Sequence, residues 1–557
     1  MTVSRTCAAL TLLLTLLGGV ACVRPGQPPV KNAPPSTKPE QKSTLPPEEP
    51  DEDSTKGEHL LTVKDLAPIG TTSLESVGTE ESLLNPSTIT DALAVIDNGL
   101  KAADPADRFT AIEGLGSAPW EDARPRLLAA TRDSDPQVAM DALSMLSLRA
   151  DSSLQPDLEP YLSWGNLWRK GPNHPAFIPS RSDPDNPMTP EEALAKLKDP
   201  KLIPVIHGLL TAQDDNDKVI QGIRLADLYG PATFESELAA IFNNVDPQSP
   251  RYTVAKVLLR AKINVEQNER YLKKALNPAS EDANAVIPAL NALKAAADLK
   301  KTEWVPEIRA LLKSPIETMR GQAVMVLGQM GQPLSDAEWG EAIGNVEERS
   351  VFVDSMYRFA PKSVIPMLWK ALDPAVRDTD DDVILITLSK LGDPKAFDEL
   401  YKSSQQKLDG KYTSDAIRAT EALAILDDER VIPVLRDILN DTTQPVRRQY
   451  LALQGIGRLR TAADLPTLVR YYRNFRDAQP GLAAYAAAIA LSLAKPGTPT
   501  TQAPGDRLIW PLLNYGRFAP LYGRPAWTQA TIDAGKGTPA KSETGAPAST
   551  PPGGGTP

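Results

Sequence analysis

The chain has 557 residues, with 71 acidic side chains, 60 lysines or arginines and a formal net charge of −11. This acidic balance disfavours unaided binding to nucleic acid or anionic lipid, and it favours a basic partner. The only cysteines are Cys7 and Cys22, so the rest of the chain holds no disulfide framework, thiolate zinc site or cysteine nucleophile. With three histidines in the whole chain, a histidine-rich metal site is not expected either.

Residues 1–21 have the three parts of an export signal. A short start that contains Arg5 precedes an apolar stretch from Cys7 to Leu17, and small residues then lead to Cys22. The apolar stretch is shorter than the ~20 residues that span a bilayer. We therefore expect a cleaved signal peptide and not a permanent transmembrane helix.

The residues Gly18-Gly-Val-Ala before Cys22 resemble the lipobox of bacterial lipoproteins, although Gly19 stands where that family prefers leucine. The resemblance implies a lipid on Cys22, which then becomes the first residue of the mature chain. It also implies the outer membrane of a Gram-negative cell, facing the periplasm, because Val23 replaces the Asp that commonly retains lipoproteins in the inner membrane. The alternative is an ordinary secretory signal in which Cys22 has no role.

Residues 22–87 are predicted to form a disordered tether that begins at the lipidated cysteine. The stretch from Val23 to Lys56 is rich in Pro, Ser, Thr, Lys and Glu and almost free of large apolar residues. Such a stretch cannot offset its ordering entropy, and its prolines keep it extended. The acidic run from Glu48 to Asp53 fits a solvated charge cluster in this tether, and the alternative is a docking motif for a basic partner.

Between residues 88 and 494 a pattern recurs: a proline, an aliphatic residue two positions later, and apolar residues five and six positions later. Proline suits the first turn of a helix, where its missing N–H loses no hydrogen bond, and the apolar positions share one helical face. Each copy therefore predicts the start of a short amphipathic helix. The clear copies begin at Pro204, Pro306, Pro366 and Pro433, and weaker copies begin at Pro125, Pro288 and Pro466.

A polar turn and a second amphipathic helix follow several of these copies. The turns are rich in Asp and Pro, which end one helix and cap the next. They run from Asp133 to Pro136, from Asp214 to Asp217 and from Asn440 to Pro445. Four glycines are predicted to lie at or near the ends of second helices, namely Gly328, Gly331, Gly455 and Gly457.

Helix pairs of this kind cannot bury their apolar faces alone, so they are expected to stack. The pattern resembles the HEAT-repeat family, including its shorter bacterial HEAT-like form, most clearly at 123–146, 304–331 and 430–459. The resemblance implies an all-α fold: an α-solenoid of stacked antiparallel helix pairs, with disordered segments before and after it. The spacing varies from 33 residues between Pro433 and Pro466 to 60 between Pro306 and Pro366, which we interpret as inserted or divergent units.

The helical pattern breaks between Tyr161 and Thr189. This insertion is rich in Pro, Asp and Asn and contains Trp164, Trp168 and Phe177. The aromatic side chains fit two interpretations: they pin the loop onto neighbouring helices, or they project to bind a partner. We take the three aromatic residues as candidate partner-binding residues.

The run from Asp378 to Asp382 superficially matches a calcium loop. However, positions six and twelve of an EF-hand are here Val383 and Ser389, where that loop needs Gly and Glu. The run is therefore predicted to be an inter-helix turn whose aspartates cap a helix from Val383 to Leu391. No metal, cofactor or catalytic residue is predicted, since the sequence has no phosphate-binding loop, dinucleotide fingerprint or nucleophile elbow.

The composition changes again from Lys495 onward. Residues 498–504 and 536–557 are rich in Pro, Gly, Thr and Ala and are predicted to be disordered. Between them, residues 508–527 form an aromatic segment with arginines that begins near Trp510 and ends at Trp527. This segment is expected to cap the open end of the solenoid, and the alternative is that Trp510 and Trp527 bind a partner.

The sequence favours a function without catalysis: a membrane-tethered scaffold of the cell envelope whose solenoid binds a protein or peptide partner. One alternative is an enzyme or enzyme subunit with an unrecognised site near the 161–189 insertion. Another is a spacer in which the repeat array holds the C-terminal tail away from the membrane.

Overall fold

The computed structural model describes residues 83–149, 151–161, 189–212, 215–244, 250–278, 283–344, 349–372, 379–408, 410–426 and 428–497. Within these residues the chain is all-α, as predicted. Its 24 α-helices run from Pro86 to Ala494, and the two strands have two residues each. In this described part, no helix is both long enough and apolar enough to cross a lipid bilayer.

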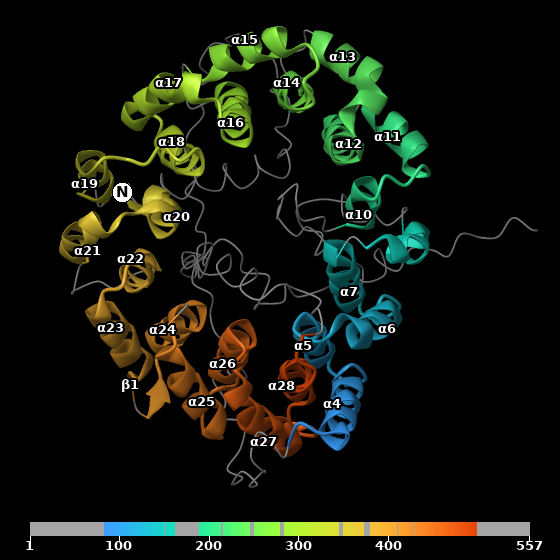
Figure 1. The fold of residues 1–557 in the computed structure, drawn as a ribbon, viewed down its shortest axis with the longest axis vertical. Helices are drawn as coiled ribbons and strands as arrows, with labels where there is room; N and C mark the ends of the chain where they lie inside the picture. Colours follow the sequence, from blue (N-terminus) through green and yellow to red (C-terminus); the bar gives the residue numbers. More distant parts are fainter. Residues whose placement is uncertain are drawn as a thin grey trace, which may run out of the picture.

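The helices alternate between an outer and an inner layer around a central opening (Figure 1). The outer helices are α4 (Pro86–Gly99), α6 (Trp120–Ala130), α8 (Gln155–Leu158), α11 (Leu202–Leu210), α13 (Glu235–Asn243), α15 (Val265–Ala275), α17 (Val305–Ala310), α19 (Asp336–Gly344), α21 (Ile365–Ala371), α23 (Pro394–Ser404), α25 (Val431–Asn440) and α27 (Leu465–Phe475). The inner helices are α5 (Pro105–Leu115), α7 (Pro136–Arg149), α10 (Pro190–Lys196), α12 (Asn216–Tyr229), α14 (Arg251–Arg260), α16 (Ala283–Asp298), α18 (Glu317–Gln329), α20 (Arg349–Phe359), α22 (Thr379–Lys390), α24 (Ser414–Ile425), α26 (Val446–Leu459) and α28 (Pro480–Ala494). Each inner helix packs against the next inner helix along the chain, and the apolar core lies between the two layers.

Proline marks the start of most outer helices, as the repeated pattern predicts. Pro306, Pro366 and Pro466 occupy the first or second position of α17, α21 and α27. Pro204 and Pro433 are the third residues of α11 and α25. All five therefore lie in the first turn, where no intrahelical bond to the proline nitrogen is lost.

For the two remaining prolines the prediction is wrong. Pro125 lies inside α6, which begins at Trp120 and carries Glu121 in its first turn, where an acidic side chain stabilises the helix N-terminus. Pro288 lies inside α16, which begins at Ala283 and belongs to the inner layer. In both helices the buried apolar residues before and after the proline continue the helical face, and tertiary packing overrides the local preference of proline.

The long interval between Pro306 and Pro366 contains a divergent unit, as the sequence suggests. Three helices, α18, α19 and α20, lie in this interval, and α19 is an outer helix without a proline at its start. The fully buried Trp339 anchors α19 in the core. The pattern of prolines therefore underestimates the number of helix pairs.

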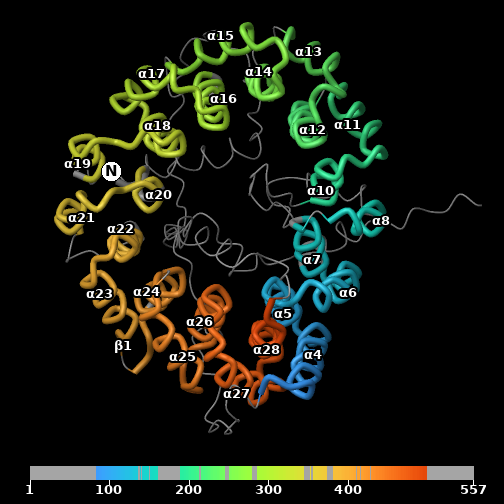
Figure 2. Tube along the Cα trace, viewed as in Figure 1, coloured from blue at the N-terminus to red at the C-terminus, as the bar shows by residue number. Residues whose placement is uncertain are grey.

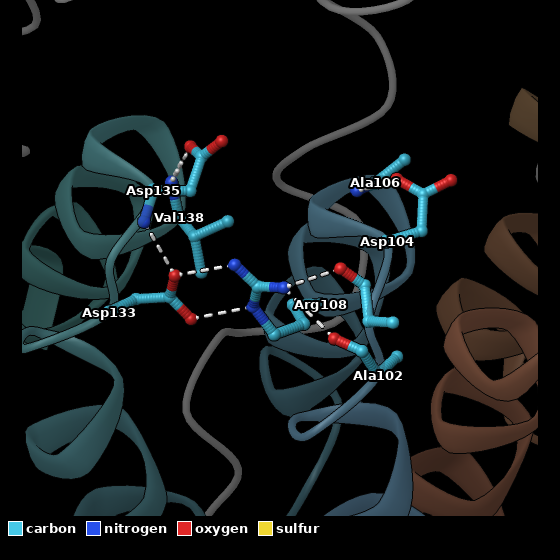
Figure 3. A network of polar contacts seen from close by, with 8 residues as sticks. Ala102, Asp104, Ala106, Arg108, Asp133, Asp135 and Val138 are labelled. Carbon is cyan, nitrogen blue, oxygen red and sulfur yellow. Dashed lines mark hydrogen bonds and ion pairs between the residues drawn. The ribbon is translucent and has the colours of Figure 1, made fainter. Parts of the chain in front are cut away.

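Aspartates of the turns between layers cap the inner helices. The Asp135 carboxylate accepts a hydrogen bond from the Val138 N–H at 3.3 Å in α7, as Figure 3 shows. At the start of α12 the Asp215 carboxylate accepts from Lys218 N–H at 3.1 Å. Each cap satisfies one N–H that the helix itself leaves unpaired.

One turn also connects neighbouring helix pairs. The Arg108 guanidinium on α5 donates two hydrogen bonds of 2.7 Å to the Asp133 carboxylate, which lies in the turn before α7 (Figure 3). The same guanidinium donates to the Ala102 carbonyl at 2.9 Å, and the hydrogen bond to Asp133 raises the pKa of Arg108. This two-pronged contact fixes the orientation of the first pair relative to the second.

The aspartate run before Val383 is part of a helix and not a turn, which corrects the prediction. Helix α22 begins at Thr379, and Asp381 and Asp382 are only 2% and 1% exposed. Asp382 pairs with the Arg418 guanidinium of α24 at 3.2 Å. Carboxylates are favoured in the first turn of a helix, so these aspartates extend α22 by four residues.

All four glycines lie at or near the ends of α18 and α26, as predicted, and Gly328 is the penultimate residue of α18. Gly331 follows α18 with a φ of 71°, which is typical of a glycine after a helix end. Gly455 and Gly457 lie four and two residues before Leu459, the last residue of α26, and Arg460 follows in the left-handed conformation. A Cβ on Gly455 would lie 2.5 Å from the Leu435 side chain, so this glycine allows α26 to approach α25 closely.

The last helix packs against the first two, so the array closes into a ring (Figure 2). We call the contact of α27 and α28 with α4 and α5 the seam. Three glycines permit it: a Cβ on Gly99 would lie 2.5 Å from the Ala484 Cβ, one on Gly114 2.6 Å from the Tyr485 Cα, and one on Gly481 2.6 Å from the Asp107 carbonyl oxygen. The expectation of an open solenoid end is therefore wrong for the described residues.

Polar contacts across the seam resemble those between consecutive outer helices. Elsewhere, ion pairs join one outer helix to the next, for example Arg126 to Asp97 at 2.7 Å and Arg309 to Glu338 at 2.6 Å. At the seam, the Arg473 guanidinium of α27 donates to the Asp91 carboxylate of α4 at 2.7 Å. The first and last units therefore meet through the same kind of contact as sequential neighbours.

A short β-hairpin interrupts the helices between α23 and α24. Strands β1 (Lys407–Leu408) and β2 (Lys411–Tyr412) pair antiparallel around the sequence Asp409-Gly410. Gly410 has a φ of 77°, which a two-residue hairpin turn requires and glycine adopts without strain. The sequence analysis missed this hairpin, although Asp-Gly between short polar-apolar stretches is its usual signal.

Candidate partner-binding face

None of the lipidation and partner-binding candidates predicted from the sequence lies in the described part of the chain. This holds for the lipidation candidate and for all five aromatic candidates, which are Cys22, Trp164, Trp168, Phe177, Trp510 and Trp527. The described residues instead present a different candidate on the inner layer, built from charged, amide and phenol side chains. We call Glu113, Glu421, Arg447, Tyr450 and Gln454 the inner polar row.

Helix α26 contributes three members of this row. Arg447, Tyr450 and Gln454 are spaced by three and four residues, so they share one face of the helix. The next residue, Gly455, lies on an adjacent side of α26 and packs against Leu435 of α25 and Ala424 of α24. Two of the three contact other inner helices, because Arg447 lies near Glu421 of α24 and Tyr450 donates to Glu113 of α5. Figure 2 shows these inner helices beside one another in the ring.

Hydrogen bonds connect the members of the row on α26 to Glu113 on α5, the first inner helix. The Gln454 amide Nε2 donates to the Tyr450 hydroxyl at 2.6 Å, and that hydroxyl donates to the Glu113 carboxylate of α5 at 2.8 Å. The Tyr450 ring also lies 6.0 Å from the Tyr485 ring of α28. The row therefore spans the seam and joins residues that are 337 positions apart in the chain.

In the other direction the row continues to α24. The Arg447 guanidinium lies 5.2 Å from the centre of the Tyr450 ring, a cation–π distance, and 3.7 Å from the Glu421 carboxylate. Burial raises the pKa of Glu421, Arg447 opposes that effect, and the nearby Asp382 adds to it. One Glu421 oxygen, Oε2, has no hydrogen-bond partner.

Next to the row, the hairpin is held to α26 by an arginine. The Arg448 guanidinium stacks on the Tyr412 ring at 3.8 Å, and it donates to the Thr420 hydroxyl at 3.0 Å and to the Gln444 amide oxygen at 2.7 Å. The side chain is fully buried, and this burial lowers the pKa of Arg448. Its Nη2 has no hydrogen-bond partner.

A second polar cluster lies on α12, α14 and α16. Arg260 of α14 pairs with Asp227 of α12 and lies 3.8 Å from Asp298 of α16, which is also 3.7 Å from Lys294. Burial lowers the pKa of Lys256 in this cluster to about 8; Lys294 adds to the effect and the two aspartates oppose it. The ion pairs join three consecutive inner helices, so we interpret this cluster as structural.

The inner polar row is suited to recognition. Buried side-chain atoms without a partner are rare in folded proteins, yet α24 and α26 supply several, namely Glu421 Oε2, Arg448 Nη2, Gln449 Oε1 and Gln454 Oε1. Both donors and acceptors are among them, which matches the alternating groups of a polypeptide backbone. In the part of the chain that the structure describes, no group of three or more His, Cys, Asp or Glu side chains could hold a metal ion.

The sequence alone does not predict this row. Arg447, Gln454 and Arg458 repeat at helical spacing, and such a pattern normally indicates a solvated face. Their burial depends on the curvature of the inner layer, which brings α24, α26 and α5 together. A search against models of known protein families and a search of curated proteins each return no match to this chain.

Proposed function

We propose that this protein is a lipid-anchored scaffold of the bacterial cell envelope. Its helices form a HEAT-like α-solenoid whose inner face binds an extended segment of a protein partner, and Cys22 carries the anchor. The single observation behind this proposal is the inner polar row, in which the buried Glu421 Oε2 and Gln454 Oε1 have no hydrogen-bond partner. Stacked helix pairs use their concave side for binding in this way.

The anchor is tested by weighing the N-terminal peptide of the mature protein by mass spectrometry. We expect the wild-type peptide to begin at Cys22 and to carry the added mass of a lipid. Cys22→Ser should abolish that mass and release the protein from the membrane fraction. An unmodified N-terminal peptide in the wild type would refute the anchor without bearing on the ring.

The binding face is tested by photo-cross-linking in intact cells. A cross-linkable amino acid replaces Met325, on the less buried side of the inner helix α18, or Ala310, on the exposed side of its outer neighbour α17. We expect one defined partner to be captured from position 325 and not from the matched position 310. Capture from position 310 alone would place binding on the outer layer and contradict the proposal.

A further inference from the structure

The sides of α26 and α28 that face the centre of the ring are buried, yet no described helix or strand covers them. Every residue of α26 from Arg447 to Arg458 is buried, and so is every residue of α28 from Gly481 to Leu491. Their described neighbours lie beside them in the inner layer or behind them in the outer layer (Figure 2). Among the described helices and strands, none lies between these two helices and the central opening.

We propose that residues 508–527 of this same chain bind across the inner polar row and occupy the face that the partner uses. The proposal rests on the proposed function, because it makes the chain its own competitor for that face. Such a segment acts at high effective concentration, so modest contacts suffice to occupy the site.

Chain length and position favour this segment. Helix α28 belongs to the inner layer and contacts α26 directly, and the described chain ends at residue 497. The ten residues 498–507 reach about 35 Å when extended, whereas packed helices lie about 10 Å apart. Residues 508–527 can therefore return to α26, α24 and α5 without strain in the connection.

The chemistry of the segment matches the face. The rings of Tyr450 and Tyr485 are 8% exposed or less, so their cover must supply apolar surface. The segment has five aromatic residues, three prolines, two arginines and no acidic residue: Trp510, Tyr515, Phe518, Tyr522 and Trp527 are the aromatic ones. Proline-containing segments commonly dock in grooves lined by aromatic side chains, and the arginines and indole N–H groups can donate to the unpaired Glu421 and Gln454 oxygens.

The acidic tether is the main competitor for the same place. Residues 23–56 contain almost no large apolar side chain, so they cannot cover the two tyrosine rings. Residues 57–82 do carry leucines and valines, but they have five acidic residues and neither an arginine nor a Trp, Tyr or Phe to match the acidic and aromatic groups of the row. A second copy of the chain and an external peptide are further competitors. The experiment below separates these four occupants.

The cysteine-free body of the chain allows a clean accessibility test. In the full chain with Cys7→Ser and Cys22→Ser, Gln454→Cys places one thiol in the inner polar row, and Gln329→Cys places one on the exposed end of α18 as a control. We expect Trp510→Ser with Trp527→Ser to accelerate maleimide labelling at position 454 about tenfold or more. Labelling at position 329 should not change, and an unchanged rate at position 454 would overturn the proposal.

A cross-linkable residue in place of Phe518 identifies what the segment touches. We expect an intramolecular cross-link, independent of protein concentration, to peptides of α24, α26 or α28. Cross-links that depend on concentration, or that map elsewhere on the ring, would refute the proposal. A cross-linker at Tyr485 that captures residues 23–82 would identify the tether as the occupant. Partner capture from position 325 tests the proposed function separately, so either idea can fail alone.

Discussion

Glycines decide how closely the last helix of the ring approaches the first two. Gly99, Gly114 and Gly481 come from three different helices, and each lies against backbone or Cβ atoms of another helix of the seam. A side chain at any of them would force the helices apart. Because the packed interior does not yield easily, even one methyl group should have a measurable effect.

We expect Gly114→Ala to lower the free energy of unfolding by about 1–3 kcal/mol. The new Cβ would lie 2.6 Å from the Tyr485 Cα, a backbone atom that cannot move alone. Gly208→Ala is the matched control, since its Cβ would meet nothing within 4 Å in α11. The control should be stabilised by about 0.5–1 kcal/mol through higher helix propensity. Urea denaturation measures both, and equal effects would mean that the seam is not closely packed in solution.

The Glu421 carboxyl gives the protein a pH-dependent stability of known sign. Burial raises its pKa above the ordinary value of 4.5, so the folded chain holds this proton more tightly than the unfolded chain. The resulting stabilisation is complete below the unfolded pKa and is lost as the pH rises through the raised one. Glu421→Gln should therefore gain stability relative to the wild type between pH 4 and pH 7. A difference in the free energy of unfolding between the two proteins that does not change with pH would contradict the raised pKa of Glu421.

At the scale of elements, α28 differs from every other inner helix in its sequence. Residues 480–494 are almost wholly alanine, leucine and other apolar residues, without a charged side chain. The last helix of an open array needs a polar outer face, whereas a helix that is apolar all round is surrounded by protein. The structure surrounds it with α4, α5, α26 and α27.

Removal of α28 should therefore loosen helices that are far away in sequence. In a chain that ends at Gln479, we expect the amide hydrogens of α4 and α5 to exchange more than about tenfold faster, since each buried leucine contributes about 2 kcal/mol. Helices α14 and α16, across the ring, should change little. A chain that ends at Gly497 keeps α28 and serves as the control. Unchanged exchange in α4 and α5 would show that the seam is not formed.

The sequence predicts the helices well and their closure poorly. Proline positions and Asp-rich turns locate the starts of α17, α21 and α12 because those signals act within one helical turn. The seam depends on contacts between residues such as Asp91 and Arg473, which are 382 positions apart, and no local pattern encodes them. The apolar character of α28 is the one signal that indicates closure. The inner polar row escapes prediction for the same reason, because Tyr450 and Glu113 meet only when the ring closes.

For the whole molecule, closure disfavours the spacer interpretation. An array that holds its C-terminal tail away from the membrane must separate its two ends, yet α28 packs directly on α4. Lys495, just after α28, lies 2.7 Å from the Asp122 carboxylate at the start of α6. The two ends of the described chain therefore lie in the same sector of the ring.

Joined ends make the protein a good subject for circular permutation. We expect a permutant that begins at residue 281, ends at residue 280 and joins residue 497 to residue 83 through about ten glycines and serines to fold with unchanged helicity. Such a linker reaches about 35 Å, which suffices for adjacent ends. In an open array of twelve helix pairs the ends would lie about 100 Å apart, because helices pack 8–10 Å from their neighbours. Circular dichroism and thermal unfolding would show a failure of the permutant at once.

Closure also limits how this chain can change in evolution. An open array gains or loses a unit by duplication or deletion, and only the two units beside the change are disturbed. A ring has no such freedom, because one added or missing pair would leave Gly481 facing the wrong partner instead of Asp107. Variation in length among descendants of this chain is therefore restricted to the connections between helices, such as the turn at Gly410 and the stretch between α8 and α10.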